Sequence, residues 1–143
     1  MRTVCKAEHP TPYSLHDMRV TGIGWEGNRL VLSFGEGIRR IGSPGSPVPG
    51  RVILEGADPE DCQALFLGEP GCPGVFSGRR QELAEFLREH PSFELEILEE
   101  LYGYRRVYYE GILSLPGQEK PIDFGIFAFF EGTIVYETEE SSC

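Results

Sequence analysis

The sequence lacks any apolar run that could cross a membrane. Its longest uninterrupted apolar segment covers residues 126–130, whereas a spanning helix needs about 20 residues. Residues 1–15 also lack an apolar stretch and are interrupted by Pro10 and Pro12, so we expect no signal peptide. These absences exclude a bundle of membrane helices, and we expect no membrane among the partners.

Cysteine is scarce, and its spacing matches no known motif. The four cysteines stand at positions 5, 62, 72 and 143, and none of them are placed as in the C-x-x-C of zinc ribbons and thioredoxin-like sites. A chain this poor in cysteine is typical of a reducing compartment, so we expect free thiols and a cytoplasmic location. Pairing of Cys62 with Cys72 across a loop remains the alternative.

Positive charge is scarce in the second part of the chain. Residues 1–54 contain seven Lys or Arg and four Asp or Glu, whereas residues 55–143 contain six and nineteen, and the net charge is −10. An acidic surface repels phosphate, which argues against duplex nucleic acid and anionic membranes as partners. The same charge favours solubility, or the attraction of a basic protein.

The composition predicts an ordinary globular domain. Apolar residues make up 40% of the chain and charged residues 25%, close to the average for such domains. The length fits a single domain over residues 1–143. Prolines and glycines predict a surface loop at residues 42–50, and we expect residues 1–12 to form a mobile tail.

Alternation of apolar and polar residues predicts a mostly β chain. Residues 18–34 are expected to form a hairpin. Further extended segments are expected at residues 38–41, 51–55, 63–67, 93–99, 104–115, 121–130 and 133–138. The best helix covers residues 80–90, and Pro91 ends it. The expected fold class is α+β, mostly β, with an antiparallel sheet of about seven or eight strands and one main helix.

The sequence allows more specific predictions for two of these strands. Residues 93–101 also fit a helix capped by Ser92, but a strand is favoured because residues 101–103 then form a hairpin loop with glycine in the left-handed position. The expected register sets Val107 opposite Ile97 and Tyr109 opposite Leu95. Residues 122–130 are apolar on both faces, which predicts a central strand that is covered on both sides.

Candidate metal ligands and nucleophiles form no coherent set. Four residues of metal-ligating types lie within thirteen positions of one another, namely Cys5, His9, His16 and Asp17. Prolines between them argue against one helix that would present all four. Ser14 lies beside His16, but no Gly-x-Ser-x-Gly elbow is present, and nothing local supports Cys62 or Cys72 with His90. We therefore expect no metal, no cofactor and no catalytic residue.

The clearest candidate for binding is one strand with alternating tyrosine and arginine. If Val107 and Tyr109 face the core, the opposite face carries Tyr104, Arg106, Tyr108 and Glu110. Tyrosine and arginine supply much of the binding energy at protein interfaces. Glu94 and Glu96 are expected on the neighbouring strand and would favour a basic protein partner. The alternative is ordinary cross-strand packing, in which Arg106 balances these glutamates.

The segment from Ser14 to Ile23, Ser-Leu-His-Asp-Met-Arg-Val-Thr-Gly-Ile, is followed by an alternating hairpin that ends at Phe34. This opening resembles that of small bacterial proteins of the immunity-protein type. The resemblance implies a β-rich fold and a role in neutralising a toxin, and it implies no catalytic residues. His16 and Asp17 are binding candidates, and they are equally explained as a polar hinge before the first strand.

The function expected from the sequence is a non-catalytic protein-binding module that recognises a basic protein. A first alternative is a small-molecule site or an enzyme on the concave face of the sheet, near His16 and Tyr104. A second alternative is a structural subunit of a homo-oligomer, assembled through exposed strand edges.

Overall fold

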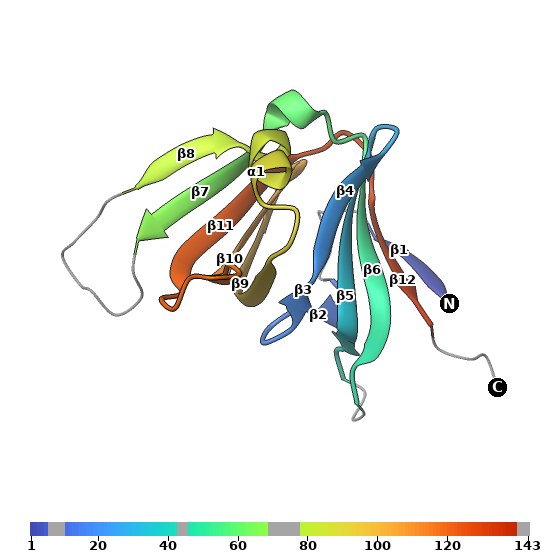
Figure 1. Cartoon of the computed structure of the whole chain (residues 1–143). Helices are drawn as coiled ribbons and strands as arrows, with labels where there is room; N and C mark the ends of the chain where they lie inside the picture. The colour runs from blue at the N-terminus through green and yellow to red at the C-terminus, as the bar shows by residue number, and fades with distance from the viewer. Residues whose placement is uncertain (6–10, 43–45, 69–77, 140–143) are drawn as a thin grey trace.

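Two antiparallel sheets form most of the molecule (Figure 1). The structure is a computed structural model that describes residues 1–5, 11–42, 46–68 and 78–139. These ranges contain twelve strands, the helix α1 and one 3-10 turn, which confirms the α+β, mostly β class. The strands outnumber the expected seven or eight because several short edge strands carry too few residues to show an alternating pattern. Within the same ranges, no helix is both long and apolar enough to span a bilayer.

The first sheet contains the N-terminal hairpin and the C-terminal strand. Its members, in spatial order, are β1 (Arg2–Cys5), β12 (Ile134–Thr138), β6 (Val48–Glu55), β5 (Arg29–Arg40) and β2 (Tyr13–Ser14), with β4 (Gly22–Glu26) also paired to β5. Two predicted strands merge in β5, which bends at a bulge between Phe34 and Ile38. Gly37 makes the bend possible: its φ is 123°, and a Cβ there would lie 2.6 Å from the Val48 nitrogen.

The N-terminal residues differ from the expected mobile tail. Residues 2–5 form β1, which pairs with β12 along its whole length, and the Met1 ammonium donates a hydrogen bond of 3.0 Å to the Thr138 carbonyl. These backbone hydrogen bonds order a segment that lacks a strong strand pattern. The rest of the predicted tail includes Pro10 and lies mostly outside the described residues, which resume at residue 11.

The second sheet positions the residues predicted to bind. Its members, in spatial order, are β3 (Arg19–Val20), β9 (Glu94–Gly103), β10 (Arg106–Ser114), β11 (Ile122–Phe129), β7 (Cys62–Gly68) and β8 (Arg79–Glu82). The strand predicted at residues 93–99 is therefore correct, but it runs on to Gly103. The hairpin turn is formed by Tyr104 and Arg105, and Arg105 takes the left-handed φ of 56° in place of the expected glycine.

The register predicted for β9 and β10 is wrong. Val107 lies opposite Tyr102 and Tyr109 lies opposite Glu100, because the turn is later than expected. A bulge between Glu110 and Gly111 then leaves Leu98 without a direct partner and sets Gly111 opposite Ile97. One extra residue reverses the alternation of a strand, so Leu95 and Ile97 face the core together with Val107 and Tyr109.

The helix α1 (Leu83–Glu89) is shorter than predicted because the residues before it continue β8 as far as Glu82. It lies between the two sheets at one end of the molecule (Figure 1). Phe86 anchors it among the rings of Phe66 and Phe124. Before β7, Asp58 caps the 3-10 turn η1 (Pro59–Asp61), since its Oδ1 accepts a hydrogen bond of 2.9 Å from the Glu60 nitrogen.

The inner faces of both sheets and α1 share one hydrophobic core. In β11 the inward residues Phe124, Ile126 and Ala128 are fully or almost fully buried. On the outward face, Phe127 is half-buried and Phe129 is 36% exposed. Among the described elements, none covers this outer face, so the expectation that β11 is covered on both sides is wrong for this part of the chain.

Candidate functional site

The outer face of the second sheet carries carboxylates beside large apolar side chains. We call this surface the acid–aromatic face. The register places these residues on it: Glu94, Glu96, Glu99, Leu101, Arg106, Tyr108, Glu110, Asp123, Phe127 and Phe129. The face lies across the central strands β9, β10 and β11, which hold its side chains in a fixed array.

The structure brings together most of the residues predicted to bind. Arg106, Tyr108 and Glu110 alternate with buried residues along β10 and point outward, and Glu94 and Glu96 lie beside them on β9. Tyr104 is at the tip of the hairpin and is 65% exposed. Backbone pleating explains this arrangement, because alternate side chains of a strand share one face.

Glutamates face one another on this surface. Glu99 lies directly opposite Glu110, and Asp123 is close enough to act on Glu110 as well. Burial raises the pKa of the Glu110 carboxyl, and the charges of Asp123 and Glu99 raise this pKa further. Cross-strand pairs of like charge are destabilising, so the face holds negative charge at a cost in stability.

Arginine does not neutralise the face as the packing alternative expected. Arg19 forms an ion pair with Glu94 at 3.0 Å, whereas the Arg106 side chain lies along Gly103, where a Cβ would come within 2.9 Å of its Nε. Among the described residues, no cation forms an ion pair with Glu96, Glu99 or Glu110. These carboxylates therefore remain open to an external cation.

The raised pKa of Glu110 predicts a pH-dependent effect on stability. A carboxyl whose pKa is raised on folding binds its proton more tightly in the folded state, so its ionisation costs stability as the pH rises. We expect Glu110→Gln to melt like the parent below the ordinary pKa of glutamate, and at a slightly higher temperature above the raised pKa. Thermal unfolding across this pH range, with exposed Glu60→Gln as the control, measures the effect. A lower melting temperature at neutral pH would contradict it.

Tyr108 is held in place by a glycine on the neighbouring strand. A Cβ on Gly125 would lie 2.5 Å from the Tyr108 hydroxyl oxygen and 2.7 Å from Cζ. The phenol end of the side chain therefore occupies the space above Gly125, an arrangement in which an aromatic ring covers a glycine in a sheet. Burial, followed by the charge of Glu110, raises the pKa of Tyr108. The phenol stays neutral and can both donate and accept a hydrogen bond.

His16 and Asp17 lie at the edge of β9, in the corner where the chain passes from one sheet to the other. His16 Nδ1 is 2.9 Å from the Leu98 carbonyl oxygen, and the Asp17 nitrogen donates a hydrogen bond of 2.7 Å to the Ile97 carbonyl. Asp17 adopts a left-handed φ of 64°. These contacts agree with the polar hinge. Leu98 lies six positions before Tyr104, or about 20 Å along an extended strand, so the structure does not bring His16 and Tyr104 together.

A half-buried carboxylate, that of Glu100, completes this corner. Glu100 accepts a hydrogen bond of 3.1 Å from the Leu15 nitrogen and one of 2.7 Å from the Tyr102 hydroxyl. It lies on the inner face because of the bulge at Leu98. These hydrogen bonds attach the corner to β9, which explains why polar residues occur between β2 and β3.

The candidate nucleophile Cys62 is not activated. Its side chain is fully buried, and its thiol is 3.4 Å from the Asp58 carbonyl oxygen. Burial raises the pKa of this thiol to about 12, so almost none of it is the reactive thiolate at neutral pH. Cys72 and His9 lie outside the described residues. Within the described part of the chain, no group of His, Cys, Asp and Glu has the arrangement of a metal site.

The outer face of the first sheet shows the opposite electrostatic pattern. Three arginines and three glutamates pair with one another over an apolar row: Arg2, Arg29 and Arg51 with Glu26, Glu55 and Glu137. Beneath these pairs, Val31, Ile53 and Val135 are almost completely buried although no further helix or strand of the described residues covers them. Long arginine side chains cover apolar surface in this way, so this face satisfies its own charges.

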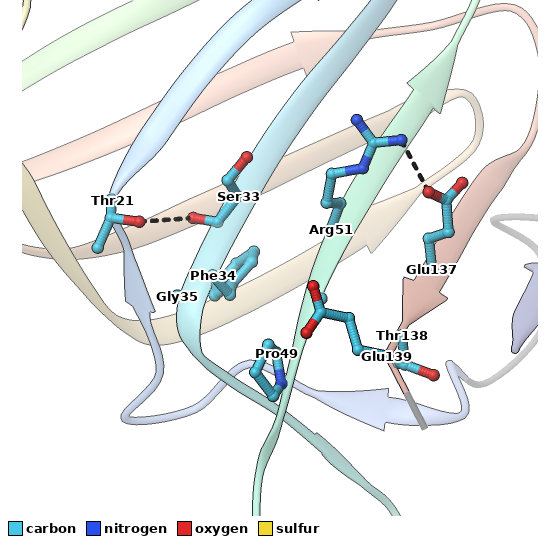
Figure 2. Close-up of a pocket in the computed structure, with 10 residues that line it drawn as sticks. Thr21, Ser33, Phe34, Gly35, Pro49, Arg51, Glu137, Thr138 and Glu139 are labelled. Carbon is cyan, nitrogen blue, oxygen red and sulfur yellow. Dashed lines mark hydrogen bonds and ion pairs between the residues drawn. The ribbon is translucent and has the colours of Figure 1, made fainter. Parts of the chain in front are cut away.

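A cavity of about 510 Å³ opens at the lower end of this face (Figure 2). Arg51 contributes to its wall but is held by Glu137 at 2.7 Å, and the Thr21 hydroxyl lies 3.5 Å from the Ser33 carbonyl oxygen. In Figure 2, Pro49 and Glu139 lie below Arg51. The wall therefore offers hydroxyl groups, backbone groups and carboxylates.

Sequence reasoning missed the aromatic part of the acid–aromatic face. Phe127 and Phe129 were expected to be covered, because a strand that is apolar on both sides is usually central. The glycine at position 125, opposite a tyrosine-rich strand, was the available signal. The chain matches no family model, no curated protein and no solved structure. Fold and site define a mostly β protein with one charged outer face whose carboxylates are largely without described ion-pair partners.

Proposed function

We propose that this chain is a non-catalytic binding module that recognises a basic protein through the acid–aromatic face. The observation that supports this most strongly is the contrast between the two outer faces. On the first sheet Arg2, Arg29 and Arg51 form ion pairs with three glutamates, whereas Glu96, Glu99 and Glu110 on the second sheet have no described ion-pair partner. These carboxylates repel one another at a cost in stability, and a cationic partner would relieve that repulsion.

The apolar part of the face supports the same proposal. Leu101 is 58% exposed, and Phe129 and Tyr108 lie on the two strands that follow it in the sheet. Interfaces combine a few aromatic anchors with charged groups that guide the encounter. We propose a cytoplasmic location, and the resemblance of residues 14–34 to immunity-type openings supports a toxin as the partner.

The test is a selection of random dodecapeptides displayed on phage. The parent protein is the bait, and the selected peptides are expected to be enriched in arginine, lysine and apolar residues. Glu99→Lys/Glu110→Lys should lower the affinity of the selected peptides by at least about tenfold, and added salt should weaken binding of the parent. Fluorescence anisotropy with synthetic peptides measures both effects.

The matched control is Glu60→Lys/Glu119→Lys, which changes the net charge equally at exposed positions outside the acid–aromatic face. It should retain at least half of the parent affinity. Selected peptides without basic residues, or equal binding to both charge-reversed variants, would show that the proposed surface is incorrect.

A further inference from the structure

Three cavities with shared lining residues lie between the acid–aromatic face and the outer face of the first sheet. The first, of about 110 Å³, is lined by Arg19, Glu96 and Ile112 and shares Glu94 and Ser114 with a second of about 530 Å³. The second shares Thr21 with the cavity of about 510 Å³ in Figure 2. We call the three together the seam groove, because Thr21 stands between β3 of one sheet and β4 of the other.

The lining of the seam groove has a consistent chemistry. Hydroxyl groups recur along it, and these belong to Thr21, Ser33, Ser92 and Ser114. Serine and threonine hydroxyls can donate and accept hydrogen bonds, as a peptide backbone requires. Side chains of Phe93, Leu115 and Pro116 supply apolar surface between them.

The charges of the seam groove favour a cationic ligand. Arg19 is neutralised by Glu94 at 3.0 Å, and Arg51 by Glu137 at 2.7 Å. Toward the two ends, Glu96 and Glu139 line the groove, and no described cation forms an ion pair with either. Glu139 thus offers a carboxylate in one end cavity, and in the other the two glutamates, Glu94 and Glu96, exceed the single charge of Arg19.

We infer that the seam groove binds an extended basic segment of the partner, which continues from the acid–aromatic face around the corner at Thr21. This inference rests on the proposed function and specifies the form of the ligand. A helix is about 10 Å wide and straight over its length, so it fits neither the smallest cavity nor the turn at Thr21. An extended chain rises about 3.3 Å per residue and can follow both.

The test compares long and short peptides on groove-filling variants. Thr21→Tyr and Ser114→Phe place bulk in the groove at exposed positions, outside the core, and Gln118→Tyr is the matched control on an exposed turn. The probes are the tightest selected dodecapeptide and the hexapeptide half that carries most of its basic residues. Each groove variant should lower the affinity of the dodecapeptide about tenfold and that of the hexapeptide less than about twofold. The control should change neither affinity.

The outcomes separate this inference from the proposed function. Unchanged dodecapeptide binding to both groove variants would overturn the extended-segment inference while Glu99→Lys/Glu110→Lys still weakened both peptides. Failure of that charge reversal, or a selection that recovers no basic peptide, would overturn both. Amide chemical shifts measured with the dodecapeptide give an independent readout. Shifts at Ser33 and Glu139 support the groove, and shifts confined to β9, β10 and β11 contradict it.

Discussion

Phe86→Ala is expected to lower the free energy of unfolding by about 3–5 kcal/mol. The Phe86 ring is fully buried. Its centroid lies 4.8 Å from the ring centroid of Phe124, 5.5 Å from that of Phe93 and 5.8 Å from that of Phe66. Its loss leaves a cavity between the helix and two strands, whose rings are fixed by the sheet and cannot close it. Urea denaturation followed by circular dichroism measures the change.

The helix depends on this contact because α1 has only seven residues. A helix of this length is not stable alone in water, so its order comes from the packing of Phe86 and Leu83. Exposed Arg88→Ala on the same helix is the control and should change stability by less than about 0.5 kcal/mol. A loss below about 1 kcal/mol for Phe86→Ala would mean that the ring cluster does not hold the helix.

Strand locations were the most predictable part of the fold. Alternating residues identified the hairpin before Phe34 and the long strands of the second sheet, because a half-buried strand must place apolar side chains on one face. The short strand β2 could not be found this way, and β3 was predicted only as part of the hairpin at residues 18–34. Each has two residues, and each is ordered by hydrogen bonds from a distant part of the chain.

Register was less predictable because one residue decides it. The turn at Tyr104 and Arg105 uses a non-glycine residue with positive φ, which sequence rules assign to glycine or asparagine. The bulge at Leu98 then restores the inward direction of Leu95 and Ile97. His16 and Asp17 contact Leu98 and Ile97 beside this bulge, and no local pattern encodes these contacts.

The residue types of the candidate site could be predicted, but the full set of residues on the face could not. Tyr108 and Glu110 were placed on the outer face because Val107 and Tyr109 are apolar neighbours within the same strand. The prediction could not include Phe129, because exposure depends on which elements cover a sheet. It also assigned the wrong cation to the glutamates, since Arg19 is far from Glu94 in sequence and adjacent to it only in the folded chain.

Substitution by alanine should have different effects at two glycines of the second sheet: at Gly111 it should lower stability, and at Gly125 it should lower peptide affinity. A Cβ on Gly111 would overlap the Glu96 carbonyl oxygen and lie 2.8 Å from its carbon, both backbone atoms at the bulge. Gly111→Ala must therefore separate β9 from β10, and we expect it to lower the free energy of unfolding by about 3 kcal/mol. Chemical denaturation measures this, and a loss below about 1 kcal/mol would mean that the bulge shifts without cost.

Gly125→Ala instead meets the far end of the Tyr108 side chain, which can rotate away. We expect a change in stability below about 1 kcal/mol, because a flexible side chain yields more easily than backbone. The displaced phenol no longer lies beside Glu110, so the affinity for the selected basic peptides should fall about tenfold. Tyr108→Phe separates the two contributions of this side chain: it keeps the ring over Gly125 and removes the hydroxyl. If it binds as the parent does while Gly125→Ala binds weakly, the ring position supplies the affinity; if both bind as the parent does, Tyr108 does not take part in recognition.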